Sequence, residues 1–254
     1  MNIATWNVNS LKVRLPHVLQ WLEANPVDVL CLQETKLNDD KFPVSEINAA
    51  GYEVVFIGQK TYNGVAILSR HPISDVVKNN PLLDDDQQRL LTATIQGIRI
   101  ICAYIPNGQS PDSDKFQYKL RWLSSLQNWL AEQAAKYDEL ALLGDFNIAP
   151  EDRDVHDAAA WLGQNLVSNP ERAAFQAMLS VPLVDAFRLF KQAEKSFSWW
   201  DYRALGYRLN KGMRIDHILL TPTLAKRCTE CVIDRAPRKW QQPSDHAPVI
   251  ATLT

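Results

Sequence analysis

The sequence of 254 residues has no apolar run near 18 residues, the length that a membrane-spanning helix needs. Its first residues, Met1-Asn2-Ile3, enter a strand-like pattern at once and show no signal peptide. An excess of basic charge is also missing. The formal net charge is −2, so the chain lacks the overall positive field of a histone-like protein. We therefore expect a soluble cytoplasmic protein with reduced thiols and no membrane partner.

Cysteine is scarce, and its spacing gives little support for a metal site. Cys31 and Cys102 lie inside apolar runs and are expected to be buried. Cys228 and Cys231 have the CxxC spacing, but no second CxxC and no nearby histidine pair accompany them. The pattern therefore disfavours a zinc or redox role for these thiols.

No linker, low-complexity tract or long charged run divides the chain, so we expect one domain over residues 1–254. Short apolar strands alternate with helical stretches, which predicts sheets packed face to face and covered by helices. A hairpin is expected over residues 90–104, with its turn at Gly97-Ile98. Helices are predicted around residues 15–22, 116–134 and 174–179. Strands are predicted at 3–7, 27–33, 52–57, 65–69, 90–96, 99–104, 140–143, 196–199, 214–221, 230–235 and 249–254.

Polar residues recur where the predicted strands end. Glu34 follows the apolar run 29–32, and Asp145 and Asn147 follow Leu142-Leu143-Gly144. Such carboxylates and amides suit a hydrolase with an oxygen-ligated metal, because Mg²⁺ prefers a few carboxylates together with water and phosphate oxygens. Each signal also has a structural alternative. Taken alone, Glu34 is better explained as a solvated acid at a strand end. Asp145 with Asn147, a weak signal by itself, is also explained by an Asx turn that closes a strand.

One histidine is placed for chemistry. His246 follows Asp245 between two prolines, just before the apolar run 249–253. Asp216 lies at the start of another strand and can fix the tautomer of a histidine elsewhere in the fold. We expect His246 to be that partner, because in a strand Asp216 and its neighbour His217 point to opposite faces.

Eight motifs follow one another along the whole chain. They are WNVNSL (6–11), LQETK (32–36), GQKTYNGVAIL (58–68), YIPNG (104–108), GDFNIAP (144–150), FSWWDYR (197–203), GMRIDHI (212–218) and PSDHAP (243–248). Together they make the chain resemble the exonuclease III family of abasic-site endonucleases, within the endonuclease/exonuclease/phosphatase superfamily. The resemblance implies a four-layer α/β sandwich of two packed mixed sheets flanked by helices. It also implies hydrolysis of DNA phosphodiesters without a covalent intermediate.

By this resemblance the enzyme is a magnesium-dependent DNA repair nuclease, with Mn²⁺ as a possible substitute, and a monomer. Its partner is double-stranded DNA with abasic sites, nicks or blocked 3′ ends. The implied catalytic residues are Tyr104, Asp145, Asn147, Asp216 and His246. The implied metal residues are Asn7, Glu34, Asp145, Asn147, Asp245 and His246, supported by Asn9. The implied DNA-binding residues are Lys36, Tyr62, Asn107, Trp199, Arg203 and Met213.

Basic side chains on loops and helix starts are further candidates for phosphate contact, namely Lys36, Lys60, Lys115, Lys119 and Arg121. In the aromatic segment 199–214 we expect Trp199 to line the pocket and Trp200 to pack in the core. One segment departs from the family, because residues 157–167 are bulkier and less basic than in other members. A wall at Leu166 and Val167 would hinder the flipping of an abasic nucleotide but permit attack at a 3′ end.

Two alternatives remain open at this point. One is a phosphatase or phosphodiesterase of the same superfamily that acts on a lipid or inositol phosphate. The complete FSWWDYR and GMRID stretches argue against it. The other is a non-catalytic DNA-binding relative that kept the fold, and the retained functional residue types in all eight motifs argue against that.

Overall fold

The computed structural model describes residues 1–254 and contains two six-stranded mixed sheets. The first sheet has the order β13 (Cys228–Ile233), β14 (Val249–Leu253), β1 (Asn2–Asn7), β2 (Val29–Gln33), β4 (Val65–Ser69), β3 (Glu53–Ile57). The second has the order β5 (Ile73–Lys78), β6 (Leu90–Ile95), β7 (Ile98–Tyr104), β8 (Leu140–Asp145), β12 (Asp216–Leu220), β9 (Val184–Asp185). A separate short ribbon pairs β10 (Trp199–Trp200) with β11 (Gly212–Met213).

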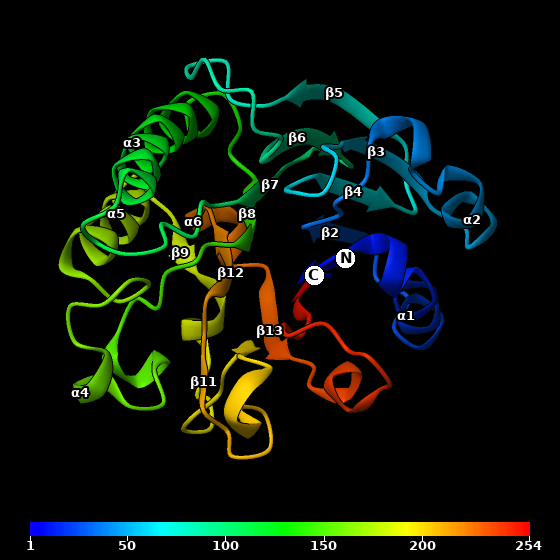
Figure 1. Cartoon of the computed structure of the whole chain (residues 1–254). Helices are drawn as coiled ribbons and strands as arrows, with labels where there is room; N and C mark the ends of the chain where they lie inside the picture. The colour runs from blue at the N-terminus through cyan, green and yellow to red at the C-terminus, as the bar shows by residue number, and fades with distance from the viewer.

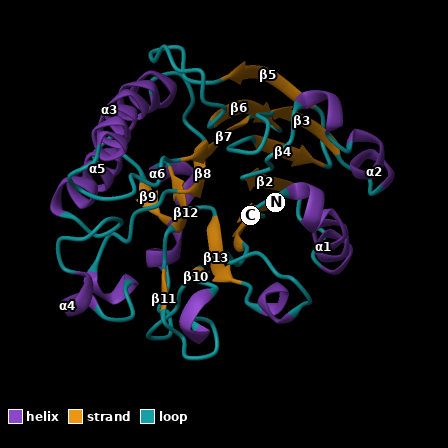
Figure 2. Ribbon diagram, viewed as in Figure 1, coloured by secondary structure: helices purple, strands orange, loops and turns teal.

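Helices cover the outer faces of both sheets (Figure 1, Figure 2). α1 (Leu11–Ala24) and α2 (Val44–Ala49) lie beside the first sheet, whereas α3 (Asp114–Ala134) and α5 (Asn169–Leu179) lie beside the second. Two single-turn helices are α4 (Ala158–Trp161) and α6 (Pro222–Ala225), and five short 3₁₀ turns complete the set. None of the helices has the length and apolar character needed to cross a membrane.

Three buried clusters show the layers. The largest lies between the sheets and contains residues of both, such as Ile67 of β4 and Ile100 of β7. A second joins the outer face of the β7–β8 sheet to α3 and α5, and a third joins the outer face of the other sheet to α1. Burial of apolar area in these three interfaces supplies the main driving force for folding. The predicted four-layer sandwich is therefore confirmed.

Most long elements were predicted, with small errors at their ends. The hairpin of β6 and β7 is present, but Ile98 already pairs with Ile95, and the turn is at Gln96-Gly97 with φ of 48° and 81°. The predicted strand 196–199 begins only at Trp199. The short elements α2, α4, α6, β9 and β11 and the strand β5 had not been predicted from the sequence. β5 is an edge strand with an irregular register between Ser74 and Val77, which removes the alternating pattern.

Strand register brings distant polar residues to one end of the sandwich. In the second sheet Asp145 lies opposite both Tyr104 of β7 and Asp216 of β12. In the first sheet Asn7 ends β1 beside Gln33, the residue before Glu34. The close packing of β7 and β8 requires glycine at Gly144, because a Cβ there would lie 1.8 Å from the Ala103 carbonyl oxygen. The sequence GD thus places Asp145 where the strands meet.

Candidate active site

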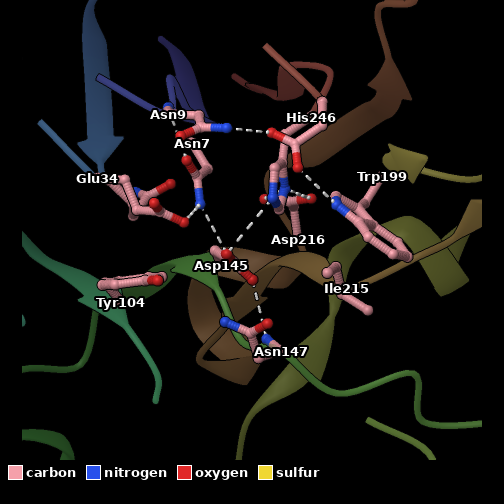
Figure 3. A network of polar contacts seen from close by, with 12 residues as sticks. Asn7, Asn9, Glu34, Tyr104, Asp145, Asn147, Trp199, Ile215, Asp216 and His246 are labelled. Carbon is pink, nitrogen blue, oxygen red and sulfur yellow. Dashed lines mark hydrogen bonds and ion pairs between the residues drawn. The ribbon is translucent and has the colours of Figure 1, made fainter. Parts of the chain in front are cut away.

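Asp145 lies at the centre of the site. Figure 3 shows it between Glu34 and Asn7 on one side and His246 on the other. Its carboxylate is buried. The backbone N–H of Asn147 donates to Asp145 Oδ1 over 2.9 Å, and Asn7 Nδ2 donates to Asp145 Oδ2 over 2.8 Å. The Asx turn that we weighed as an alternative is therefore present, and its backbone bond fixes the orientation of the candidate catalytic carboxylate.

The Asx turn also positions Asn147 itself. Asn147 has φ of 50°, in the left-handed region, and its side-chain amide is held at both ends. Nδ2 donates to the Ile105 carbonyl over 3.0 Å, and Oδ1 accepts from Asn107 Nδ2 over 3.0 Å. Asn107 and Asn147 therefore form one amide pair at the floor of the site.

His246 and Asp216 form the pair that the sequence predicted. Nδ1 of His246 lies 3.0 and 2.9 Å from the two carboxylate oxygens of Asp216, and both residues are buried. Ser198, which the sequence analysis missed, donates to Asp216 Oδ2 over 2.6 Å. His217 points away from this pair and contacts Arg214 and the Ile148 carbonyl. The other ring nitrogen of His246, Nε2, faces Asp145 Oδ2 over 3.7 Å.

Burial and charge separate the proton affinities of these groups. Burial alone would lower the pKa of His246, but the carboxylates of Asp216 and Asp145 raise it to about 10. Burial raises the pKa of Asp145 to about 7, with His246 opposing the rise and Asp216 adding to it. Burial, followed by the charges of Glu34 and Asp145, raises the pKa of Tyr104 well above its usual value. Near neutral pH the site therefore holds a charged imidazolium, a carboxylate near its midpoint and a neutral phenol.

A second group of polar residues lies on the Glu34 side of Asp145. Asn7 Nδ2 donates to Glu34 Oε1 over 2.9 Å, and Lys36 Nζ lies 2.8 Å from Glu34 Oε2. Asn9 accepts from Lys36 Nζ over 2.6 Å and donates to Asp245 Oδ1 over 3.0 Å. A continuous chain of contacts therefore joins Glu34 to Asp245 around the rim of the site.

The expected metal ligands make different contacts in this structure. Asn7 directs its side-chain nitrogen toward the carboxylates of Glu34 and Asp145, and its oxygen accepts the backbone N–H of Asn9 over 2.9 Å. His246 is protonated and presents donors on both ring nitrogens, and the amide of Asn147 is engaged at both ends. For these three residues the assignment as metal ligands therefore stays a prediction. Asp145 and His246 belong, with Asp216, to a buried group whose ligand atoms lie within 4.8 Å of one another, and Glu34 and Asp245 add further carboxylate oxygens.

The charges around the cavity suit a divalent cation. Carboxyl groups outnumber cations here. Glu34, Asp112, Asp145, Asp201 and Asp245 line the cavity together with Arg203 and the charged His246, and Lys36 pairs with Glu34. The donors available to a cation are carboxylate oxygens, which Mg²⁺ and Mn²⁺ prefer to thiolate or imidazole. The residues present therefore fit such an ion.

Several backbone conformations at the site are strained. Asn9, Glu34, Lys36 and Asn147 have φ between 44° and 54°, and Leu166 has φ of 74°. Non-glycine residues in this region are uncommon and persist where surrounding contacts hold them. Other non-glycine residues with positive φ lie elsewhere in the chain, for example Asp75, Gln96 and Lys195, so these conformations alone do not mark the site.

The cavity itself has a volume of about 790 Å³ and reaches from Asp145 to a hydrophobic wall. Trp199 and Leu166 line this wall, together with Trp161 and Ile215, which the sequence analysis had not named. Trp199 Nε1 donates to Asp245 Oδ2 over 3.0 Å, so the hydrophobic wall is hydrogen-bonded to one of the candidate metal ligands. Trp200 is fully buried, as expected.

Two expected wall or contact residues lie behind the surface. Val167 and Met213 are buried in a small cluster beneath the wall and do not line the cavity. The expectation of direct DNA contact by Met213 and of a wall at Val167 is therefore wrong. Met213 instead supports Trp199, its partner in the β10–β11 ribbon.

The candidates for contact with DNA phosphates differ in their exposure. Lys60, Lys115, Arg121 and the aromatic candidate Tyr62 are exposed at the surface, and Arg203 is exposed at the cavity. The expectation that Lys119 contacts a DNA phosphate is wrong, because its side chain is completely buried and pairs with Glu171. The signal was available in the sequence. Lys119 stands three residues after Phe116 and four before Leu123, which places it on the apolar face of the helix.

Comparisons with known proteins agree with this geometry. Residues 4–246 match the model of the Endonuclease/Exonuclease/phosphatase family. The exodeoxyribonuclease III of Haemophilus influenzae is 35% identical over 99% of both chains. A structure of a variant of the 3′ phosphatase NExo from Neisseria, bound to product DNA hairpin, is 44% identical with a TM-score of 0.98, covering 100% of this chain and 99% of that one. An AP endonuclease from Archaeoglobus fulgidus is 39% identical with a TM-score of 0.96, at the same coverage. The chain therefore belongs to the Endonuclease/Exonuclease/phosphatase family and, within it, to the exonuclease III group of AP endonucleases.

Proposed function

We propose that this protein is a metal-dependent DNA repair nuclease that hydrolyses phosphodiester bonds in duplex DNA. The observation that carries the proposal is the pairing of a buried, charged His246 with Asp145, 3.7 Å away, at the end of a cavity with an excess of negative charge. Phosphoryl transfer needs an aligned nucleophile and neutralisation of charge, and this arrangement offers both. The names of the relatives, exodeoxyribonuclease III, 3′ phosphatase and AP endonuclease, support the same reaction class.

Each residue has a distinct part in the proposed reaction. Asp145 orients the attacking water and accepts its proton, because its carboxylate is fixed by Asn7 and by the Asx turn. His246 donates through Nε2 to a phosphate oxygen and stabilises the developing negative charge, while Asp216 holds its other nitrogen. We assign Asn147 and Tyr104, which lie beside Asp145 in Figure 3, to contact with the scissile phosphate, for which the neutral phenol can serve as a donor.

We assign Glu34, with Asp245 and Asp145 as further oxygen donors, to a bound Mg²⁺ or Mn²⁺. A divalent ion held there neutralises phosphate charge as a Lewis acid. Asn7 and Lys36 keep the Glu34 carboxylate turned toward the cavity. Asn9 and Trp199 do the same for Asp245.

The substrates that we propose are abasic sites, blocked 3′ ends and 3′ termini of duplex DNA, acted on by a monomer. Lys36, Asn107, Tyr62 and Arg203 are the proposed contacts to DNA around the cavity. Such contacts make binding sensitive to salt. Trp199 and Leu166 form the wall against which a base-free sugar would lie, so their bulk favours 3′-end processing over cleavage at an internal abasic site.

A substrate panel tests the proposal. Initial rates are measured with Mg²⁺ on duplexes that carry an internal abasic site, a 3′-phosphate at a nick, or a blunt end, and on inositol phosphates. Turnover of the DNA substrates alone supports the proposal. Turnover of inositol phosphates alone would place the chain elsewhere in its superfamily, and no turnover at all would support a binding protein.

A further inference from the structure

The buried ion pair of Lys119 and Glu171 lies directly behind the site and takes no part in the reaction described above. Lys119 comes from α3 and Glu171 from the first turn of α5, and neither side chain is exposed. Removing two charges from water is costly, and a buried pair is rarely needed for stability alone. Its contacts therefore indicate what it does.

Lys119 holds the floor of the site. Its ammonium group has three donors, and all three are used: by the carbonyls of Asn107 at 3.1 Å and Asn147 at 2.7 Å, and by Glu171 Oε1. These are the two residues whose side-chain amides pair at the bottom of the cavity. The following Gly108 packs so closely that a Cβ there would lie 3.0 Å from Lys119 Cδ.

Glu171 holds the wall of the site. Its Oε1 also accepts the backbone N–H of Leu166 over 3.0 Å, and its Oε2 accepts the N–H and hydroxyl of Ser168 over 3.1 and 2.5 Å. Leu166 lines the cavity and has φ of 74°. Asn147, on the other side, has φ of 50°. The pair therefore restrains two residues with positive φ that both line the cavity.

We propose that Lys119 and Glu171 act as a positioning couple that fixes the distance between the phosphate-facing amides and the pocket wall. Lys119 sets the floor that the phosphate contacts, whereas Glu171 sets the wall that admits or excludes a flipped sugar. The couple thereby controls both the rate and the choice between abasic sites and 3′ ends. This inference rests on the proposed function.

The two halves of the couple have different expected effects. Lys119→Met, a substitution of similar length without charge, frees the Asn107 and Asn147 carbonyls. It should lower kcat on every substrate by roughly 10- to 100-fold, since misplacement of about 1 Å has effects of that size, with KM changed less than about 3-fold. Lys119→Arg should recover part of this loss. Glu171→Gln removes the charge that accepts hydrogen bonds from Leu166 and Ser168 and so weakens the positioning of the pocket wall. It should change the ratio of abasic-site to 3′-phosphate cleavage by about 5-fold or more.

The ratio of kcat/KM values on two substrates is the decisive readout, because it does not depend on the fraction of folded enzyme. Arg227→Met is the matched control. It breaks the Arg227–Glu139 ion pair, 2.6 Å, at the opposite end of β8. It should lower the melting temperature without changing the ratio. The double variant Lys119→Met/Glu171→Gln should be little worse than the more damaging single one.

The outcomes separate this inference from the proposed function. If the wild-type protein cleaves none of the three duplexes, the proposed function fails first. If the wild type is active but Glu171→Gln keeps the ratio and Lys119→Met keeps kcat, the couple is only structural and the inference is overturned. Should Lys119→Met not fold, the ratio measured with Glu171→Gln and the rate measured with Lys119→Arg decide alone.

Discussion

The pair of His246 and Asp216 gives a prediction that can be worked out from the structure. Replacement of Asp216 by Asn keeps the shape and one acceptor for His246 Nδ1 but removes the charge that holds the ring protonated. Burial lowers the pKa of His246, and without the charge of Asp216 mainly Asp145 opposes this effect. The pKa of His246 should therefore fall from about 10. We expect kcat at pH 8 to fall by roughly 10²- to 10⁴-fold, the range for loss of a proton donor in the transition state.

The same substitution changes stability with a defined sign. The pKa of His246 is raised on folding from 6.5 to about 10, a shift that corresponds to at most roughly 5 kcal/mol. A raised histidine pKa stabilises the fold fully below pH 6.5, and this contribution is lost as the pH rises through about 10. The Asp216→Asn variant should therefore be less stable than the wild type at pH 6, and the difference should shrink toward pH 10.

The assays are the pH profile of kcat/KM and urea unfolding at pH 6 and pH 10. In the wild type the alkaline limb should follow His246, near pH 10, and in the variant it should move to lower pH. Asp28→Asn is the matched control, because it alters another carboxylate–histidine pair, Asp28 with His71 at 2.9 Å, away from the cavity. An alkaline limb that stays in place, with an equal loss of stability at both pH values, would refute the assignment of His246 as the charged group.

Three further predictions follow from the contacts. His246→Ala and Asp216→Ala should each lower kcat severely. Because the two residues act as one unit, kcat of the double variant should be little lower than that of the more damaging single variant, and additive losses in the logarithm of kcat would contradict this. Chelation should abolish cleavage, Mg²⁺ should restore it, and Glu34→Ala should raise the Mg²⁺ concentration for half-maximal rate; an unchanged requirement would exclude Glu34 as a ligand. Trp199→Ala and Leu166→Gly should change the ratio of abasic-site to 3′-end cleavage, by an amount comparable to the roughly 1–3 kcal/mol of one lost stacking contact. Leu166→Gly should also relieve the strain at φ of 74°, so a normal melting temperature with an unchanged ratio would show that the wall does not select substrates.

Much of the fold and site could be predicted because the signals were local. Glu34 and Asp145 stand at the carboxyl ends of apolar strands, where sites in mixed sheets often lie. Asp216 begins its strand and lies opposite Asp145 because β12 runs antiparallel to β8. The pairing of His246 with Asp216 followed from strand alternation, which turns His217 away. The meeting of these residues at one end of the sandwich depends on the strand order and on the packing of the two sheets.

What could not be predicted depends on side-chain direction and packing. The rotamer of Asn7, with its nitrogen toward the carboxylates, is set by the backbone N–H of Asn9 and has no sequence signal. Met213 looked like an exposed member of a DNA-binding segment, but the chain buries it beneath Trp199. The role of Glu171 was readable in part, since Ser168 and Glu171 have the spacing of a capping box, but its ion pair with Lys119 joins helices far apart in sequence.

The central claim is that Asp145 drives metal-dependent hydrolysis of DNA. The most direct measurement compares the wild type with Asp145→Asn on a duplex with a 3′-phosphate at a nick, first in chelator and then with excess Mg²⁺. If Asp145 has this role, the wild type should release phosphate only after Mg²⁺ is added. The variant should bind the duplex with nearly unchanged affinity but react at least roughly 10²-fold more slowly. Equal rates for the two proteins, or full activity of the wild type in chelator, would contradict it.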